Sequence, residues 1–177
     1  MSGAQQCDLI VTLGSNPLPA VVAALHLRPP RVHIIYTHDV RFLAERTYRL
    51  LQRENIEAGI SCCLSAHEDV PTVEREVRNL LAQVGHSRLH YTGGTKLMST
   101  HVHRLWSAVG GSLSDASYLT SAGCFIQDDG RRQRLDREPR LSLEQIARLH
   151  FDVSPKCEDH HLDDKIKFAP RLRIAWS

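Results

Sequence analysis

The sequence predicts an α/β protein with a mostly parallel sheet flanked by helices on both faces. Short runs of apolar and β-branched residues, typical of buried strands, alternate with longer stretches whose apolar residues recur at helical spacing. Gly, Pro, Asn and Asp mark the boundaries between these segments. Because the strands are regularly separated by helices, we expect right-handed crossover connections and parallel pairing.

Length and composition fit one compact domain with a short appendage. The chain has 177 residues, of which 42% are hydrophobic and 24% charged, close to an ordinary folded protein. We assign residues 5–150 to this domain. In residues 151–177 the periodicity fades, and Pro155 and Pro170 interrupt the chain. We therefore expect a linker there, or the start of a connection to a further domain.

The first half of the chain predicts three strands, each followed by a helix. Asn16 is expected to cap the first helix with Pro17 in its first position, because proline has no N–H to leave unpaired there. Asp39 is expected to cap the second helix. The strands are expected at 8–13, 31–36 and 57–64, and the helices at 17–27, 40–54 and 70–84, the second helix with Val40, Leu43, Ala44, Thr47, Leu50 and Leu51 facing the core.

The second half continues this pattern and then changes. After a strand at 87–91, a helix is expected to end at Gly110 and Gly111, with a core face of Leu97, Met98, Val102, Leu105, Trp106 and Val109. Two short strands are expected at 117–119 and 124–127, with a turn at 128–130. Ser142 and Gln145 form a capping-box pattern that opens a short helix to about His150.

Charge and cysteine content exclude several classes of protein. The formal net charge is +2, and basic and acidic residues are balanced in both halves of the chain, so binding to long nucleic acid is not indicated. The five cysteines are odd in number and lack C-x-x-C spacing, which argues against a disulfide framework or a zinc ribbon. The sequence shows neither the pattern of a secretory leader nor an apolar run of about 18 residues, the length that a membrane-spanning helix needs. We expect a cytoplasmic protein without membrane contact.

Four loops are expected at the carboxyl ends of the strands, where open α/β sheets bind ligands. They are rich in small, hydroxylic, amide and imidazole side chains, and each leads into a helix N-terminus. Backbone N–H groups and the helix dipole favour an anion there, typically phosphate. The loops span Gly14–Pro17, Thr37–Asp39, 65–69 and Thr92–Lys96, and the candidate contacts outside the last of them are Gly14, Ser15, Asn16, Thr37, His38, Ala66 and His67.

The stretch Thr92-Gly93-Gly94-Thr95-Lys96 is the most informative of the four. Two glycines allow close approach of the backbone to a ligand, and the threonines and the lysine add hydrogen-bond donors. A tight turn whose glycines only satisfy backbone geometry is the alternative. Lysine usage favours the ligand: 18 of the 22 basic residues are Arg, and Lys96 is the only Lys before Lys156. A compact ammonium group suits a phosphate contact.

Other phosphate, metal and cofactor motifs do not match. A P-loop has Lys directly after Gly, but Thr95 intervenes here, and no G-x-G-x-x-G follows the first strand. His101 and His103 are two residues apart in a predicted helix, so they should face different directions. The spacing of His150, Cys157, His160 and His161 matches no standard zinc module. We expect neither a metal nor a cofactor.

The Gly-Gly-Thr-Lys stretch, with Leu97-Met98-Ser99 after it, resembles the signature of CARF domains, the CRISPR-associated Rossmann-fold sensors. The early Leu13-Gly14-Ser15-Asn16 loop and the trailing hairpin and helix fit the same family. The resemblance covers about residues 5–150. It implies a Rossmann-like domain that binds cyclic oligoadenylate, most often cyclic tetra-adenylate and in some members hexa-adenylate, and contacts it through Thr92, Gly93, Gly94, Thr95 and Lys96.

The same resemblance implies a homodimer that holds the ring across its two-fold axis and allosterically activates an attached effector, such as a nuclease or deaminase, in antiviral defence. Higher oligomers through the effector domain would be compatible with it. Two alternatives stay open. One is a metal-independent ring nuclease that degrades its own ligand, with the catalytic residues unknown. The other is a dimerisation scaffold for a DNA-binding segment, against which the balanced charge argues.

Overall fold

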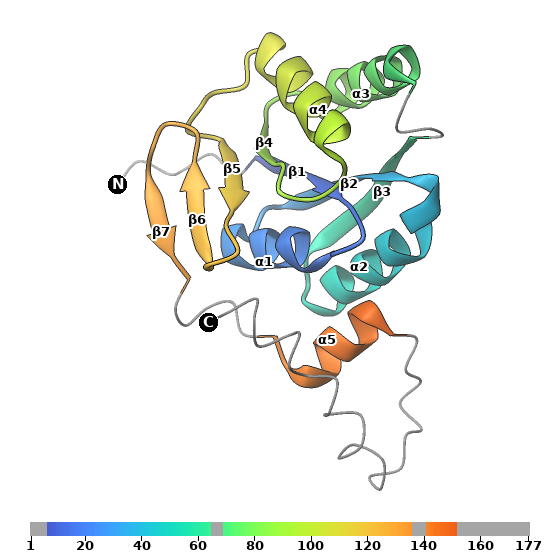
Figure 1. The fold of residues 1–177 in the computed structure, drawn as a ribbon, viewed down its shortest axis with the longest axis vertical. Coiled ribbons are helices and arrows are strands. Elements are labelled where there is room, and N and C mark those ends of the chain that lie inside the picture. The colour runs from blue at the N-terminus through green and yellow to red at the C-terminus, as the bar shows by residue number, and fades with distance from the viewer. Residues whose placement is uncertain (1–6, 65–68, 136–140, 152–177) are drawn as a thin grey trace, which may run out of the picture.

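The computed structural model describes residues 7–64, 69–135 and 141–151, which form one seven-stranded sheet with helices on both faces (Figure 1). The strands are β1 (Asp8–Leu13), β2 (Arg31–Thr37), β3 (Glu57–Leu64), β4 (Ser87–His90), β5 (Ala116–Leu119), β6 (Cys124–Gln127) and β7 (Arg132–Arg134). The helices are α1 (Leu18–Leu27), α2 (Arg41–Arg53), α3 (Val70–Val84), α4 (Lys96–Ala108) and α5 (Leu143–His150).

The order of strands in the sheet is β3-β2-β1-β4-β5-β6-β7. The first five are parallel to their neighbours, and β6 and β7 are antiparallel. Helices α1 and α2 cover one face of the sheet, and α3 and α4 cover the other (Figure 1). The α/β class and the mostly parallel sheet that the sequence predicts are therefore confirmed.

Strand β1 lies in the middle of the sheet and is buried on both faces, as parallel strands under two helical layers must be. Leu9 and Val11 belong to the core under α1 and α2, whereas Ile10 belongs to the core under α3 and α4. This alternation explains why the sequence of β1 is a continuous apolar run rather than an alternating one.

The bounds of the six strands predicted with residue ranges agree with the structure to within one residue, but β7 was given no range and two helix starts differ. Helix α1 begins at Leu18, with Pro17 as its N-cap, and the Asn16 Oδ1 accepts the Leu18 N–H at 3.1 Å. A 3-10 turn at His38–Val40 precedes α2, which begins at Arg41 with Val40 as its N-cap. The expected cap by Asp39 is therefore wrong, because this turn incorporates Asp39 before the α-helix starts.

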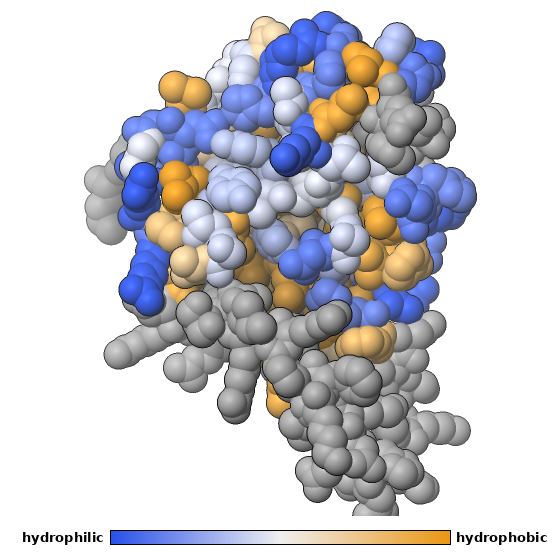
Figure 2. All heavy atoms as spheres, in the orientation of Figure 1, coloured by the Kyte–Doolittle hydropathy of each residue, from blue (hydrophilic) through white to orange (hydrophobic). Residues whose placement is uncertain are grey.

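The core faces of the helices are largely as expected. All six residues assigned to the inner face of α2 are buried. In α4, Leu97 is only partly buried. Val109 is the clear exception: it is the C-cap residue and is 58% exposed, because the helix ends before its face returns to the core. In Figure 2 the middle of the visible face is pale, which marks residues of intermediate hydropathy, with both hydrophilic and hydrophobic residues around them.

Helix α5 packs against α2. Its capping box is present, with Ser142 accepting the Gln145 N–H at 3.1 Å and donating its own N–H to the Gln145 side chain at 2.7 Å. Gln145 also donates to Glu54 at 2.6 Å. Residues 152–177 lie outside the described residues, so the division at residue 150 stays a prediction.

Candidate functional site

The direction in which strands are added to the sheet reverses between β1 and β4. The chain places β2 and β3 on one side of β1 and then crosses to β4 on the other side. The loops after β1 and β4 consequently lead to helices on opposite faces of the sheet, so that α1 and α4 diverge from these loops (Figure 1). Open α/β sheets bind their ligands in the crevice that forms at such a point.

Glycines bring these two loops into backbone contact. A Cβ atom on Gly14 would lie 2.7 Å from the Gly94 nitrogen, and one on Gly93 would collide with the Thr12 carbonyl oxygen. Gly94 has φ +84°, in the region that favours glycine. Hydroxyl groups fix the second loop further, since the Thr12 Oγ1 and the Ser99 Oγ both donate to the Gly93 carbonyl, at 2.7 and 2.8 Å. The glycines thus have a structural role independent of any ligand.

A first cavity of about 330 Å³ opens between these loops and the turn after β5. Its walls are mostly backbone, small side chains and aliphatic groups, with one tyrosine. The lining residues are Gly14, Ser15, Asn16, Leu18, Pro19, Val22, Thr92, Gly93, Gly94, Tyr118, Leu119, Thr120, Ser121 and Gly123. Its size and mixed lining are those of a small-molecule site.

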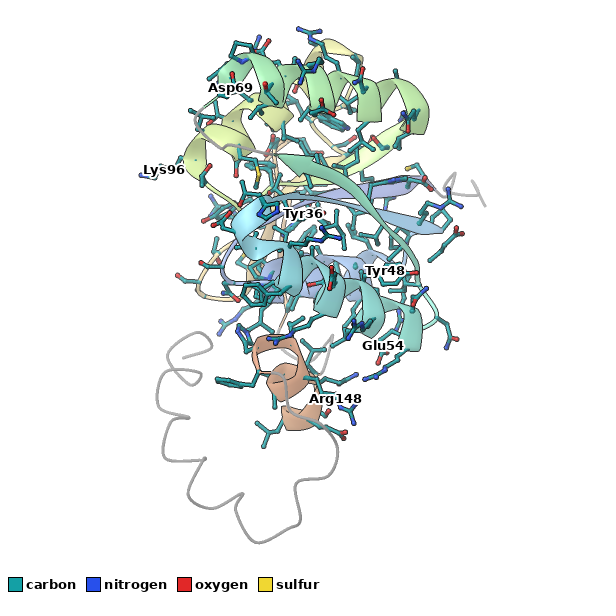
Figure 3. The ribbon with its side chains drawn as sticks, turned by 90° about the vertical axis from the view of Figure 1, so that its right-hand side faces the viewer. Tyr36, Tyr48, Glu54, Asp69, Lys96 and Arg148 are labelled. Carbon is teal, nitrogen blue, oxygen red and sulfur yellow. The ribbon has the colours of Figure 1, made fainter. Side chains whose placement is uncertain are left out.

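A second cavity of about 600 Å³ adjoins the first and shares Thr92, Gly94 and Tyr118 with it. The first turns of α4 form one of its walls. The remaining lining residues are Tyr91, Lys96, Ser99, Thr100, His103, Arg104 and Asp128. Lys96 is the first residue of α4 and is exposed, and Figure 3 shows its side chain extending outward from the molecule. Its charge lies where the helix dipole already favours an anion.

The threonines of the Gly-Gly loop have structural partners. The Thr92 Oγ1 accepts the Leu119 N–H at 2.6 Å and ties the loop to β5. The Thr95 Oγ1 caps α4 by accepting the Met98 N–H at 3.2 Å. Each hydroxyl still has its own hydrogen to donate. The loop is therefore held in place by bonds that leave donor groups at its surface.

Three polar side chains in the second cavity form a hydrogen-bonded cluster. The Tyr91 hydroxyl donates to the Asp128 Oδ1 at 2.6 Å, and the His103 Nε2 lies 2.6 Å from the Asp128 Oδ2. The rings of Tyr91 and His103 meet edge to face at 4.9 Å. Burial, with the hydrogen bond to Asp128 added, raises the pKa of Tyr91 far above its usual value, so its phenol stays a hydrogen-bond donor.

The structure brings some of the predicted residues together and not others. Gly14, Ser15 and Asn16 line the first cavity with Thr92, Gly93 and Gly94, and Lys96 lines the second. Thr95 lines neither cavity and serves as the helix cap. At the end of β2, Thr37 is buried and His38 is exposed, and neither lines a cavity. Ala66 and His67 lie outside the described residues.

Sequence reasoning missed the wall formed after β5 and the cluster on Asp128. The stretch Thr120-Ser121-Ala122-Gly123 follows a strand and has the same small, hydroxylic composition as the other loops, so that signal was available. His103 and Asp128 are 25 residues apart, and no spacing in the sequence indicates that they pair.

His101 and His103 turn to different partners, Glu74 and Asp128, as their spacing on a helix predicts. Within residues 7–64, 69–135 and 141–151, no three His, Cys, Asp or Glu side chains gather as a metal site would need. His160, His161 and Cys157 lie outside these ranges. In the same part of the chain, none of the helices has the length and apolar character to span a membrane.

Comparison with known proteins gives structural likeness only. No family model and no curated protein sequence matches the chain. Among solved structures, Can2 from Sulfobacillus thermosulfidooxidans, in complex with cyclic tetra-adenylate, matches 81% of the chain with a TM-score of 0.69 and 20% identity. Protein VC1899 from Vibrio cholerae matches 81% with a TM-score of 0.68 and 10% identity.

A third structure, a type III CRISPR defence DNA nuclease activated by cyclic oligoadenylate, matches 82% of the chain with a TM-score of 0.64 and 16% identity. The chain spans 39% of the length of Can2 and of VC1899, and 23% of the nuclease. At these identities the likeness concerns the fold and not the activity. The chain therefore has the Rossmann-like α/β fold that it shares with Can2, VC1899 and the CRISPR defence nuclease.

Proposed function

We propose that this chain is a CARF-type sensor domain that binds cyclic oligoadenylate, with cyclic tetra-adenylate as the expected ring. The observation that carries the proposal is the pair of adjoining cavities at the point where strand order reverses, walled by the Gly-Gly loop and the start of α4. The fold shared with a cyclic tetra-adenylate complex and with a nuclease activated by cyclic oligoadenylate supports it.

The chemistry of the two cavities suits a cyclic oligonucleotide. Lys96 and the N-terminal N–H groups of α4 offer positive charge to a phosphate. Tyr118 lines both cavities and is 41% exposed, so its ring is available to stack on a base. With a net charge of +2, a few placed donors rather than a broad basic surface would hold the ligand.

We further propose that the ring binds across a homodimer and that binding activates an effector attached to the domain. A symmetric ring contacts two copies of one surface equally well when they are related by a two-fold axis, so each protomer would supply one Lys96 and one Gly-Gly loop. A dimer that closes on the ring has two states with different affinities, which is what allosteric activation requires.

Calorimetric titration with cyclic tetra-adenylate and cyclic hexa-adenylate tests the proposal, with linear tetra-adenylate as the control ligand. We expect tight binding of one ring and much weaker binding of the linear form. Lys96→Ala should weaken binding by about 10- to 150-fold, the equivalent of one charge-assisted hydrogen bond. If neither cyclic tetra-adenylate nor cyclic hexa-adenylate binds, the proposal is overturned.

Arg49→Ala is the matched control for charge. Arg49 is an exposed basic residue on α2 that lines neither cavity. Removing it lowers the net charge by the same amount as Lys96→Ala, so we expect unchanged affinity. Equal losses in the two variants would contradict a specific role for Lys96 and indicate a general electrostatic effect.

A further inference from the structure

The second cavity contains a second cation besides Lys96. In the described part of the chain, Arg104 is the only other lysine or arginine that lines it. We infer that Arg104 is a further phosphate-binding residue of this site, and that Glu74 on α3 restrains it by competing with the ligand for its guanidinium group. The inference rests on the proposed function, because it concerns the affinity of the same site for the same ring.

Arg104 lies on the face of α4 that lines this cavity. The helical residues of the lining follow the spacing i, i+3, i+4, i+7 and i+8, which places them on one side of an α-helix. Lys96 begins this row and Arg104 ends it, about 12 Å farther along the helix axis. Ser99, Thr100 and His103 lie between them. A ligand that lies along this wall would meet a positive charge at each end.

The guanidinium group of Arg104 has donors that no protein group uses. Its Nη2 donates to the Glu74 Oε1 and lies 3.4 Å from the His101 Nδ1. Within the described residues, its Nε and Nη1 make no hydrogen bond. A guanidinium group carries five N–H donors in a planar fork that matches the oxygens of a phosphate. Since 54% of the Arg104 side chain is exposed, these donors are open to a phosphate in the cavity.

The carboxylate of Glu74 opposes such binding. Its Oε1 accepts the Arg104 Nη2 and lies 3.2 Å from the His101 Nδ1, and its Oε2 lies 3.9 Å from the Arg78 Nη2. Glu74 lines neither cavity and belongs to α3, which lies beside α4 (Figure 1). Opposite charges in contact offset each other's field, so Glu74 lowers the attraction of Arg104 for an anion. It thereby raises the ligand concentration at which the site fills.

The carboxylate inside the cavity has different partners. Asp128 is the one acidic residue among the described lining residues, and its two oxygens are occupied by the Tyr91 hydroxyl and the His103 Nε2, at 2.6 Å each. The charge of Arg104 is therefore controlled from α3, outside the cavity, and not by Asp128.

The restraint is weak enough for a ligand to overcome. The side chain of Glu74 is 26% exposed and that of Arg104 is 54% exposed, and ion pairs of this kind change an equilibrium by about two- to five-fold. A charge-assisted hydrogen bond to phosphate is worth about 10- to 150-fold. Arg104 consequently adds to the affinity of the site, and Glu74 subtracts part of that gain.

Calorimetric titration of cyclic tetra-adenylate into matched arginine variants tests the role of Arg104. We expect Arg104→Ala to weaken binding by about 5- to 30-fold, less than Lys96→Ala, because the variant also loses the competing bond to Glu74. Arg78→Ala is the control: Arg78 pairs with the same carboxylate and is 56% exposed, but it lines neither cavity. We expect it to change the affinity by less than about two-fold. Equal losses in the two variants would overturn the role of Arg104.

The restraint by Glu74 is tested with a second pair. Glu74→Gln should strengthen binding by about two- to five-fold, because Arg104 loses its competing carboxylate. Glu76→Gln alters the net charge equally on the same helix, but Glu76 pairs with Arg75 and lines neither cavity, so the affinity should stay nearly constant. In the double variant Arg104→Ala/Glu74→Gln, the gain from Glu74→Gln should vanish. A gain that persists without Arg104 would indicate a general charge effect and overturn the restraint.

The failure of the inference differs from the failure of the proposed function. If the ring binds to the wild type and to Arg104→Ala equally well, only the inference is overturned. If neither cyclic tetra-adenylate nor cyclic hexa-adenylate binds to the wild type, the proposed function fails and the inference falls with it. Weaker binding in Glu74→Gln would also overturn the restraint, because the carboxylate would then position Arg104 for the ligand.

Discussion

The ends of β2 and β4 both lead from a buried parallel strand to a helix on the same edge of the sheet, yet they differ as binding sites. After β4, the Gly-Gly loop packs against the loop after β1 and borders two cavities. After β2, Thr37 is buried and a 3-10 turn leads directly into α2. The position at the carboxyl end of a strand is therefore not sufficient. The helices that follow two neighbouring loops must also diverge to opposite faces of the sheet, as α1 and α4 do where the strand order reverses.

The largest expected effect comes from disrupting the close backbone contact between the loops after β1 and β4. In Gly93→Ala, the new Cβ would collide with the Thr12 carbonyl oxygen, which is backbone and cannot move aside alone. We expect the free energy of unfolding to fall by about 3 kcal/mol or more, with loss of binding to cyclic tetra-adenylate. Urea unfolding and calorimetry measure the two effects. The control is Gly130→Ala: Gly130, unlike Gly93, has a positive φ, but nothing lies within 4 Å of its added Cβ, so only backbone strain applies there.

A pair of threonine variants compares the two strand ends directly. Thr92→Val removes the acceptor of the Leu119 N–H and should cost about 1–3 kcal/mol of unfolding free energy, because a partly buried donor loses its partner. Thr37→Val places a similar shape at the end of β2, where no side-chain hydrogen bond of Thr37 is present within the described residues, and should change stability by less than about 0.5 kcal/mol. Equal costs in urea unfolding would contradict the contrast between the two ends.

His90, the last residue of β4, makes the stability of this region depend on pH. It is fully buried, hydrogen-bonded to Ser117 at 3.0 Å and stacked on Phe125, and burial lowers its pKa from 6.5 to about 3. A base with a lowered pKa in the folded state loses stability as pH falls below its unfolded pKa. We expect this loss to be about 1.4 kcal/mol per pH unit below about pH 6.5, continuing toward pH 3.

The variant His90→Leu isolates this contribution. Its free energy of unfolding should fall less steeply than that of the wild type between about pH 6.5 and pH 5.5, because the other titrating groups remain in both proteins. The Ser117 hydroxyl keeps a partner in the variant, since it also donates to the Leu89 carbonyl at 3.2 Å. Parallel pH profiles for the two proteins would show that His90 does not cause the dependence.

The smallest expected effect is that of His38. This residue was a candidate ligand contact because it follows β2, but it lies in the 3-10 turn, is exposed and lines neither cavity. We expect His38→Ala to change the affinity for cyclic tetra-adenylate by less than about two-fold, within the usual range of surface substitutions. A loss as large as that of Lys96→Ala would mean that the site extends to β2.

The sequence predicts most of the fold because its signals are local. Apolar runs locate the strands, and helical spacing identifies the inner face of α2. Ser142 and Gln145 predict the capping box that the structure contains. The errors are also local: a 3-10 turn displaces the start of α2 past Asp39, and α4 ends before Val109 can reach the core. Short turns of this kind differ little in energy from the first turn of an α-helix, so the residue pattern hardly distinguishes the two.

The site was predictable only in part, because its walls come from distant segments. Gly14 and Lys96 stand in recognisable loops, but the contact between Gly14 and Gly94 depends on the order of the strands in the sheet. Tyr118 lies on β5 and Asp128 directly follows β6, and the antiparallel pairing of these two strands brings both residues to the cavities. No spacing along the chain encodes that approach, so the second cavity and its His103–Asp128 pair required the structure.

The most direct test of the account is a calorimetric titration of cyclic tetra-adenylate into the wild-type chain, with the oligomeric state measured at the same concentration. The account predicts saturable binding of one ring per two chains, abolished in Gly93→Ala and weakened in Lys96→Ala. Absence of binding by this ring and by cyclic hexa-adenylate, with the chain folded, would contradict it.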